Sequence, residues 1–209
     1  MRGSLGVLGS GAVGRTLAGG LRDLGYDVSI GSRDGHAVDG WDGAVGTFAE
    51  VADRAGLVVL ATKGAAAVDV VSSVAAELAG KTVLDTTNPI ADRPPIDGVL
   101  PFFTDLDESL MERLQKAAPE ARFVKAFSST GAPTMVQPRY AAGRPTMFIC
   151  GDDGGAKHTA TEVLDALGWE AADMGGAVAA RAIEPLCMLW CIPGFRDNQW
   201  THAFKLLRQ

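Results

Sequence analysis

Six residues near the start of the chain have the types and the spacing of a phosphate-binding turn. They follow the apolar run at residues 5–8 and read Gly9, Ser10, Gly11, Ala12, Val13 and Gly14. In a G-x-G-x-x-G turn the first glycine permits the tight bend, the second leaves the backbone open to a pyrophosphate, and the third lets a helix pack on the strand. Apolar residues then recur at helical spacing, so the turn lies between a strand and a helix. Because a helix N-terminus attracts anions, the pattern predicts a dinucleotide site.

The end of the second predicted strand distinguishes between two dinucleotides. Residues 27–30 are followed by Gly31, Ser32 and Arg33. NAD sites usually carry a carboxylate here, whereas a hydroxyl and a planar guanidinium suit the dianionic 2′-phosphate of NADP. The alternative is that Asp34 binds the ribose and Arg33 is a surface charge, but Asp34 lies past the strand end. The residues therefore favour NADP(H) over NAD(H).

Composition and charge limit the class of protein. The 209 residues are 47% apolar and 21% charged, which is ordinary for one globular domain. The net charge of −6 argues against nonspecific nucleic-acid binding, which needs a basic face. The apolar stretch at 177–191 contains Arg181, Glu184 and Pro185 and is short for a bilayer, so we expect no membrane span. Strand and turn at the N-terminus leave no room for a signal peptide, and we expect a cytoplasmic protein.

The three cysteines predict reduced thiols. Cys150, Cys187 and Cys191 are odd in number and form no C-x-x-C motif. Cys187 and Cys191 are four residues apart, so on a helix they would share one face. A metal or redox pair is the alternative, and buried small apolar residues are the favoured interpretation. We predict no metal site.

The alternation of strands and helices predicts an α/β class: a Rossmann-type, doubly wound, mostly parallel sheet. Further strands are expected at 44–47, 57–61, 82–85, 123–127 and 147–150. Helices are expected at 48–54, from about 68, at 106–117, around 160–167, and at the C-terminus over Trp200, Ala203, Phe204 and Leu207. The segment 91–101, rich in proline, aspartate and glycine, predicts a long loop.

The chain divides into two parts in this interpretation. Residues 1–174 form the NADP-binding domain, and residues 175–209 form a small C-terminal helical segment rather than an independent domain. The segment carries the large apolar residues Leu186, Met188, Leu189, Trp190, Phe195, Trp200 and Phe204. Because aromatic residues and methionine are enriched at interfaces, we expect a homodimer, with an internal core as the alternative.

Taken in order along the chain, the motifs resemble a known family. They are G-S-G-A-V-G at 9–14, G-S-R at 31–33, T-N-P at 87–89, V-K-A-F at 124–127, I-C-G-D-D at 149–153, D-M-G at 173–175 and I-E-P-L at 183–186. The chain is similar to the NADP oxidoreductases dependent on coenzyme F-420, which transfer a hydride between NADP(H) and a deazaflavin. It also resembles the NADPH domain of the six-transmembrane epithelial antigen of prostate metalloreductases.

This resemblance implies a set of cofactor-binding residues. Ser10 to Val13 would contact the pyrophosphate, and Ser32 and Arg33 the 2′-phosphate. Thr62 and Lys63 would border the ribose and nicotinamide, and Asn88 and Pro89 would flank the nicotinamide. The loop that includes Ser128, Gly131 and Ala132 would form the floor under the second cofactor's ring.

Two positions depart from the family pattern. Relatives often read V-K-A-F-N-T where this chain has Ser128 and Ser129, and a serine cannot make the paired hydrogen bonds of an asparagine. The acceptor can therefore be coenzyme F-420 or a flavin such as FMN or FAD. Lys63 replaces a small or apolar residue, and either binds a phosphate or an acidic tail of the acceptor, or is a solvated lysine.

No side chain is predicted to be catalytic. His36, His158 and His202 belong to no motif, and Glu184 is expected to cap or pair at a helix start. Carbonyl reduction normally needs a positioned proton donor, whereas a flavin or deazaflavin ring delocalises the charge that it receives. We therefore expect an oxidoreductase that transfers a hydride between NADPH and such a small-molecule acceptor. The alternatives are a reductase of small imines or carbonyls and a non-catalytic NADP(H)-binding redox sensor.

Overall fold

A six-stranded parallel sheet forms the centre of the protein. The computed structural model describes residues 2–209, and its strands lie in the order β3-β2-β1-β4-β5-β6. Their bounds are β1 Arg2–Leu8, β2 Tyr26–Ser32, β3 Ala44–Thr47, β4 Leu57–Leu60, β5 Thr82–Asp85 and β6 Arg122–Lys125. This is the strand order of the Rossmann fold, in which ligands bind beyond the carboxyl ends of the strands. The predicted fold class is confirmed.

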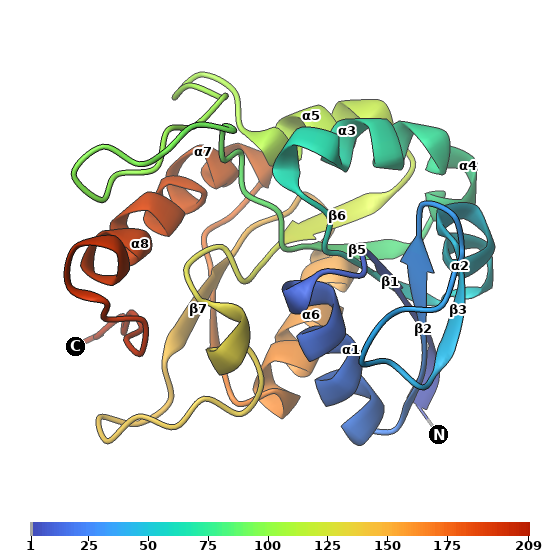
Figure 1. The fold of residues 1–209 in the computed structure, drawn as a ribbon, viewed down its shortest axis with the longest axis horizontal. Helices are drawn as coiled ribbons and strands as arrows, with labels where there is room; N and C mark the ends of the chain where they lie inside the picture. The colour runs from blue at the N-terminus through green and yellow to red at the C-terminus, as the bar shows by residue number, and fades with distance from the viewer. Residues whose placement is uncertain (1) are drawn as a thin grey trace.

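Helices cover both faces of the sheet, as Figure 1 shows. One face is covered by α1 (Ala12–Asp23) and α6 (Gly154–Ala166), whose apolar side chains share a core with β1 and β2. The other face is covered by α2 (Phe48–Arg54), α3 (Gly64–Ser73), α4 (Ala75–Leu78) and α5 (Leu110–Ala117). The strand β4 is buried on both faces, which explains its unbroken apolar run, whereas β5 ends in the buried Asp85.

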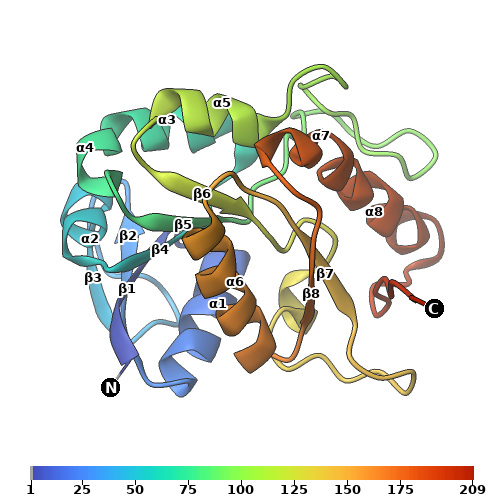
Figure 2. The ribbon, with the colours of Figure 1, turned by 180° about the vertical axis from the view of Figure 1, so that it is seen from behind.

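Two further strands form a small sheet of their own. β7 (Thr146–Ile149) pairs in parallel with β8 (Glu170–Asp173), and an isolated antiparallel bridge between Lys125 and Cys150 joins this pair to the end of β6. Figure 2 shows the pair beside α6. β8 was not predicted, because its sequence Glu-Ala-Ala-Asp has none of the β-branched or aromatic residues that favour strands.

Two helix starts differ from the prediction. α5 begins at Leu110 and not at residue 106, because Ser109 and Glu112 form a capping box: Ser109 Oγ accepts from the Glu112 N–H, and Glu112 Oε2 accepts from the Ser109 N–H. α3 begins at Gly64, four residues before the predicted start.

The predicted C-terminal helix is wrong. The chain forms the turns η1 (Ala132–Thr134) and η2 (Ala177–Ala179), then α7 (Ala180–Ile183) and α8 (Pro185–Asp197), and residues 198–209 are irregular. Asn198 takes a left-handed conformation, with φ of +54°, and ends α8. The Thr146 N–H then donates to Phe204 O, and the Leu206 N–H donates to Thr146 Oγ1. These bonds to β7 replace the hydrogen bonds of a helix.

The segment Ala177–Asp197 is long and apolar enough to cross a membrane by length and composition alone, and 39% of its most apolar window is buried within the fold. Arg181 binds Glu112 of α5 through two hydrogen bonds, and Glu184 binds the start of α5. These polar contacts fasten the segment to the rest of the domain.

Candidate nucleotide-binding site

The glycine turn connects β1 to α1 at the carboxyl edge of the sheet. Gly9 has a φ of +129°, and a Cβ at this position would overlap Ala61 O, just beyond β4. A Cβ at Gly14 would overlap Gly9 O, so the helix approaches the turn as closely as its backbone allows. Around a Cβ at Gly11, by contrast, there is only open space.

These features fit a pyrophosphate above the start of α1. Gly11 is the N-cap residue, and no side chain caps the helix. The first N–H groups of a helix have no partner within the helix, so an uncapped start leaves donors for an anion. Ser10, Ala12 and Val13 are half-buried or exposed at the same turn, where the sequence places the pyrophosphate contacts.

The tip of β2 carries the residues expected to bind the 2′-phosphate. Ser32 is buried, whereas Arg33 is exposed and takes part in none of the ion pairs within residues 2–209. Asp34, the alternative ribose ligand, accepts from Ser32 Oγ and from the His36 N–H, each at 3.3 Å. The His36 backbone is the largest cause that lowers the pKa of Asp34. The Asp34 carboxylate thus binds within its own turn, past the end of β2.

Three buried polar atoms follow β4, β5 and β6 without a hydrogen-bond partner within the described chain. They are Thr62 Oγ1, Asn88 Oδ1 and Ser128 Oγ. Asn88 Nδ2 donates to Ser128 O at 3.2 Å, so the loops after β5 and β6 are in direct contact. An unpaired buried polar atom costs about 1–3 kcal/mol, so a polar ligand that pairs these atoms is stabilised. All three residues belong to the predicted cofactor set, and their donors and acceptors fit the polar groups of a ribose and a nicotinamide carboxamide.

The loop after β4 lies against the loop after β5. A Cβ at Gly64 would overlap Asn88 O, so only glycine allows α3 to begin this close to Asn88. Pro89 is buried, and its carbonyl accepts from the Phe103 N–H at 2.9 Å. Lys63 is the exposed N-cap residue of α3, and its side chain makes no hydrogen bond or ion pair within residues 2–209. Both interpretations of Lys63 therefore stay predictions.

A strained residue directs the chain from β6 into the predicted floor of the site. Phe127 has a φ of +58°, which is rare for a bulky side chain. Its ring packs edge-on against Trp169, and its N–H donates to Met147 Sδ at 3.1 Å. A Cβ at Gly131 would lie 2.8 Å from the Trp190 ring, so α8 supports this loop from behind. Ala132, the last predicted residue, opens η1.

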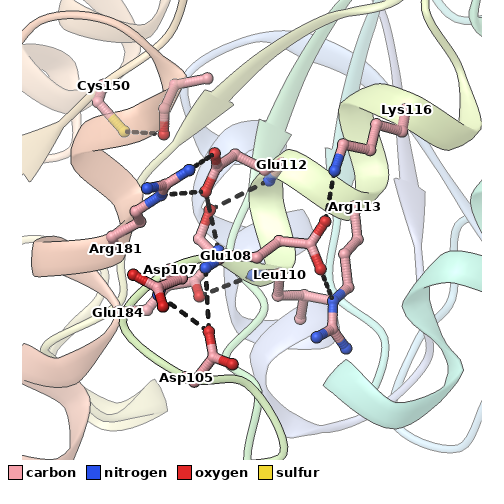
Figure 3. A network of polar contacts seen from close by, with 12 residues as sticks. Asp105, Asp107, Glu108, Leu110, Glu112, Arg113, Lys116, Cys150, Arg181 and Glu184 are labelled. Carbon is pink, nitrogen blue, oxygen red and sulfur yellow. Dashed lines mark hydrogen bonds and ion pairs between the residues drawn. The ribbon is translucent and has the colours of Figure 1, made fainter.

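Glu184 caps a helix and forms an ion pair, as predicted, although the helix is not its own. Its carboxylate accepts from the N–H groups of Leu110 and Met111 at 2.9 and 3.0 Å, as Figure 3 shows for Leu110 at the start of α5. Its Oε1 lies 2.8 Å from Lys125 Nζ, which also lies 2.6 Å from Asp85 Oδ2. We did not single out Lys125 or Asp85 from the sequence. The available signal was a lysine inside an apolar strand, because a buried ammonium needs carboxylate partners.

The remaining titratable candidates are the three histidines and the three cysteines. His158 pairs with Glu162 on the exposed face of α6, and His36 is exposed. His202 stacks on Trp190, with ring centroids 5.1 Å apart. Cys150, Cys187 and Cys191 are buried free thiols, and burial raises the pKa of Cys150 to about 12. Within residues 2–209 no group of three His, Cys, Asp or Glu side chains could hold a metal ion.

Comparison with known proteins places this arrangement among NADP-dependent enzymes. The family model described as NADP oxidoreductase, coenzyme F420-dependent, matches residues 4–89. The structure of a candidate F420-dependent NADP reductase from Arthrobacter sp. FB24 is 33% identical, with a TM-score of 0.89, and the match covers 98% of this chain and 99% of that one.

Two further matches cover only part of the other protein. Metalloreductase STEAP3 of Rattus norvegicus is 32% identical over 195 residues, which make up 90% of this chain but only 38% of STEAP3. An imine reductase from Bacillus cereus BAG3X2 is 17% identical with a TM-score of 0.62, over 90% of this chain and 58% of that one, and shows the fold alone. The near-complete match to the Arthrobacter protein and the family model agree with the motifs: the chain belongs to the coenzyme F420-dependent NADP oxidoreductase family and is an NADP-dependent oxidoreductase.

Proposed function

We propose that this protein transfers a hydride between NADPH and a flat redox acceptor, either the deazaflavin coenzyme F420 or a flavin. The nicotinamide would lie beside Thr62, Asn88 and Ser128, and the acceptor ring would stack on its exposed face. Bound NADPH supplies the hydride, and the protein holds the two rings at near-contact distance.

The observation that carries this proposal is the set of unpaired buried atoms at Thr62 Oγ1, Asn88 Oδ1 and Ser128 Oγ. They follow three neighbouring strands at the carboxyl edge of the sheet, on the same side as the glycine turn. A ligand ring that forms hydrogen bonds with these atoms removes the free-energy penalty that they carry while they are buried and unpaired.

The chemistry of these three groups favours a ring acceptor over a carbonyl. Two hydroxyls and an amide do not ionise near neutral pH and so make poor general acids, whereas carbonyl reduction calls for a positioned proton donor. The loop at 128–131 carries only serine, threonine and glycine, and such small residues would suit a planar ring above the nicotinamide. Both features support hydride transfer to a ring that delocalises the charge it receives.

Stopped-flow absorbance tests the proposal directly. The protein is mixed with NADPH and, in separate experiments, with coenzyme F420, FMN or FAD, and NADPH oxidation is followed against each acceptor alone. We expect acceleration with at least one of the three. If none accelerates oxidation while a panel of cyclic imines and ketones does, the protein is a reductase of those substrates. If NADPH binds tightly and no acceptor turns over, a redox sensor is the better account.

We also propose that the protein is a cytoplasmic homodimer. The C-terminal segment exposes large apolar side chains, among them Leu189 and Phe195 of α8, which are 53% and 45% exposed. Apolar side chains of this size are enriched at subunit interfaces. Fractionation of cells that express the protein tests the location, and recovery in the membrane fraction would contradict it.

A further inference from the structure

A fully buried lysine joins the loop of the candidate site to the C-terminal segment. Lys125, at the end of β6, has no exposed surface. Its Nζ lies 2.6 Å from Asp85 Oδ2 and 2.8 Å from Glu184 Oε1, and it donates to Thr87 O at 2.8 Å. Two carboxylates and one backbone carbonyl therefore surround this ammonium group, and they come from two separate parts of the chain, residues 85–87 and residue 184.

Every polar atom of Thr87 is held by this group of residues. Asp85 Oδ1 accepts from the Thr87 N–H at 2.8 Å and from Thr87 Oγ1 at 2.6 Å, while Lys125 binds Thr87 O. Thr87 is buried, and it immediately precedes Asn88. The backbone that carries the Asn88 amide is thus fixed on one side by Asp85 and Lys125.

Asn88 is fixed on its other side by the loops around it. Its Nδ2 donates to Ser128 O, and its carbonyl abuts the start of α3 at Gly64. Its Oδ1 is left buried and unpaired. An amide that is anchored in this way and keeps one free acceptor is preorganised for a ligand. Preorganisation strengthens binding, because little conformational entropy is lost when the contact forms.

The charged partners of Lys125 offset the cost of burying its ammonium group. Desolvation, the largest single effect, acts to lower the pKa of Lys125, but the Asp85 and Glu184 carboxylates together raise it above its ordinary value. Lys125 is therefore charged at neutral pH, and the contact with Thr87 O is a charge-assisted hydrogen bond.

We propose that Asp85, Lys125 and Glu184 form a positioning network for the nicotinamide end of NADP(H), which acts through Thr87 and Asn88. This inference deepens the proposed function and rests on its placement of the nicotinamide. Asp85 and Lys125 hold Thr87, and Thr87 fixes the Asn88 amide. Glu184 ties the same lysine to the starts of α5 and α8, so the C-terminal segment contributes to the site without touching the ligand.

Binding measurements separate this role from a purely structural one. Calorimetry compares NADPH with 2′-phospho-ADP-ribose, which has the same phosphates and adenosine but no nicotinamide. In Lys125→Met we expect the affinity for 2′-phospho-ADP-ribose to stay within about twofold, because its phosphates would bind at Gly11 and Arg33, away from Lys125. NADPH binds more tightly than 2′-phospho-ADP-ribose by the contribution of its nicotinamide. We expect this nicotinamide contribution to fall roughly tenfold in Lys125→Met, which corresponds to the loss of one hydrogen bond.

A second, milder variant keeps the proposal testable if Lys125→Met fails to fold. Thr87→Val is nearly isosteric, removes only the hydroxyl bond to Asp85, and leaves all three charges in place. We expect Thr87→Val to lose part of the nicotinamide contribution to NADPH affinity. We also expect the fluorescence emission of bound NADPH to shift, since the dihydronicotinamide ring is the fluorescent group. With an active acceptor in hand, hydride transfer in Lys125→Met slows by up to about 100-fold, the cost of misplacing a reacting group by roughly 1 Å.

Arg181→Met is the matched control. Arg181 is also a long cation that binds a carboxylate, Glu112 of α5, but it has no bond to the loop at 87–89. This variant should melt at a lower temperature and bind both ligands as the wild type does. Equal loss of both ligands in Lys125→Met and Thr87→Val, or no loss of either, would overturn the proposal. The binding assays need no acceptor, so this result is independent of whether coenzyme F420 or a flavin is reduced.

Discussion

At the scale of single residues, the preference for NADP depends on charges at the tip of β2. Arg33 is exposed and pairs with no carboxylate of the described chain, while Asp34 is held in its own turn by Ser32 and His36. A free guanidinium is able to bind a 2′-phosphate through two parallel hydrogen bonds. The specificity should therefore reside in Arg33.

Replacement of Arg33 by glutamate should weaken NADPH binding by roughly 10- to 100-fold, because a charge-assisted bond of about 1.5–3 kcal/mol is lost. NADH, which lacks the 2′-phosphate, should bind about as before. Calorimetry with both nucleotides measures this, with the exposed Arg139→Glu as the control for charge alone. An unchanged NADPH titration in Arg33→Glu would remove Arg33 from the site.

Glu112 makes stability depend on pH. Its two hydrogen bonds from Arg181 are the largest cause that lowers the pKa of Glu112 from 4.5 to about 2. A carboxyl group whose pKa is depressed in the folded state stabilises the protein above its unfolded pKa, and this stability is lost as the pH falls through the folded value.

The wild type should melt at a higher temperature than Glu112→Gln. This margin in melting temperature should be largest above pH 4.5 and should shrink between pH 4.5 and 2. Thermal melts over this range provide the measurement, with the exposed Glu120→Gln as a control that shows little margin at any pH. A margin that stays constant down to pH 2 would contradict the assignment.

At the scale of secondary-structure elements, the glycines of the turn and of α1 allow effects on folding to be distinguished from effects on nucleotide binding. A Cβ at Gly14 would overlap Gly9 O, whereas a Cβ at Gly11 or at Gly19 would meet nothing within 4 Å. Gly11 lies at the start of α1 and Gly19 within the same helix. A side chain has room at both positions, and a pyrophosphate is expected only beside Gly11.

Gly11→Val should still fold and bind NADPH at least tenfold more weakly, since its side chain would occupy the path of the pyrophosphate. Gly19→Ala should stabilise the protein by about 1 kcal/mol and leave NADPH binding unchanged. Thermal melts and calorimetry on both variants check this pair. Full NADPH affinity in a folded Gly11→Val would place the pyrophosphate elsewhere.

Local signals explain which elements could be predicted from the sequence. α2 and β3 were placed at their observed bounds, because apolar periodicity and a capping threonine are local features. Residues 198–209 were not, since their backbone bonds go to β7, more than 50 positions away in the chain. The same limit applied to the site: the glycine turn has a local motif, whereas Asp85, Lys125 and Glu184 meet only after the sheet has formed.

At the scale of the whole molecule, the proposed homodimer gives a prediction about mass. Leu189 and Phe195 are large, exposed and carried by the same helix, α8. Sedimentation of the wild type at micromolar concentration should give about twice the chain mass of 21.7 kDa. Leu189→Asp should shift the equilibrium toward one chain, because a carboxylate is costly to bury. A wild type that sediments as a single chain would remove the dimer proposal.

The central claim is direct hydride transfer from NADPH to a ring acceptor held at the strand tips, and isotope transfer tests it most directly. NADPH carrying deuterium at one face of C4 is mixed with the protein and coenzyme F420, and the reduced deazaflavin is analysed by mass spectrometry. The accepting atom of a deazaflavin is a carbon, which retains the label. The account predicts a product one mass unit heavier with one of the two C4-labelled forms of NADPH and not with the other. A reduced product without deuterium from either form would contradict direct transfer.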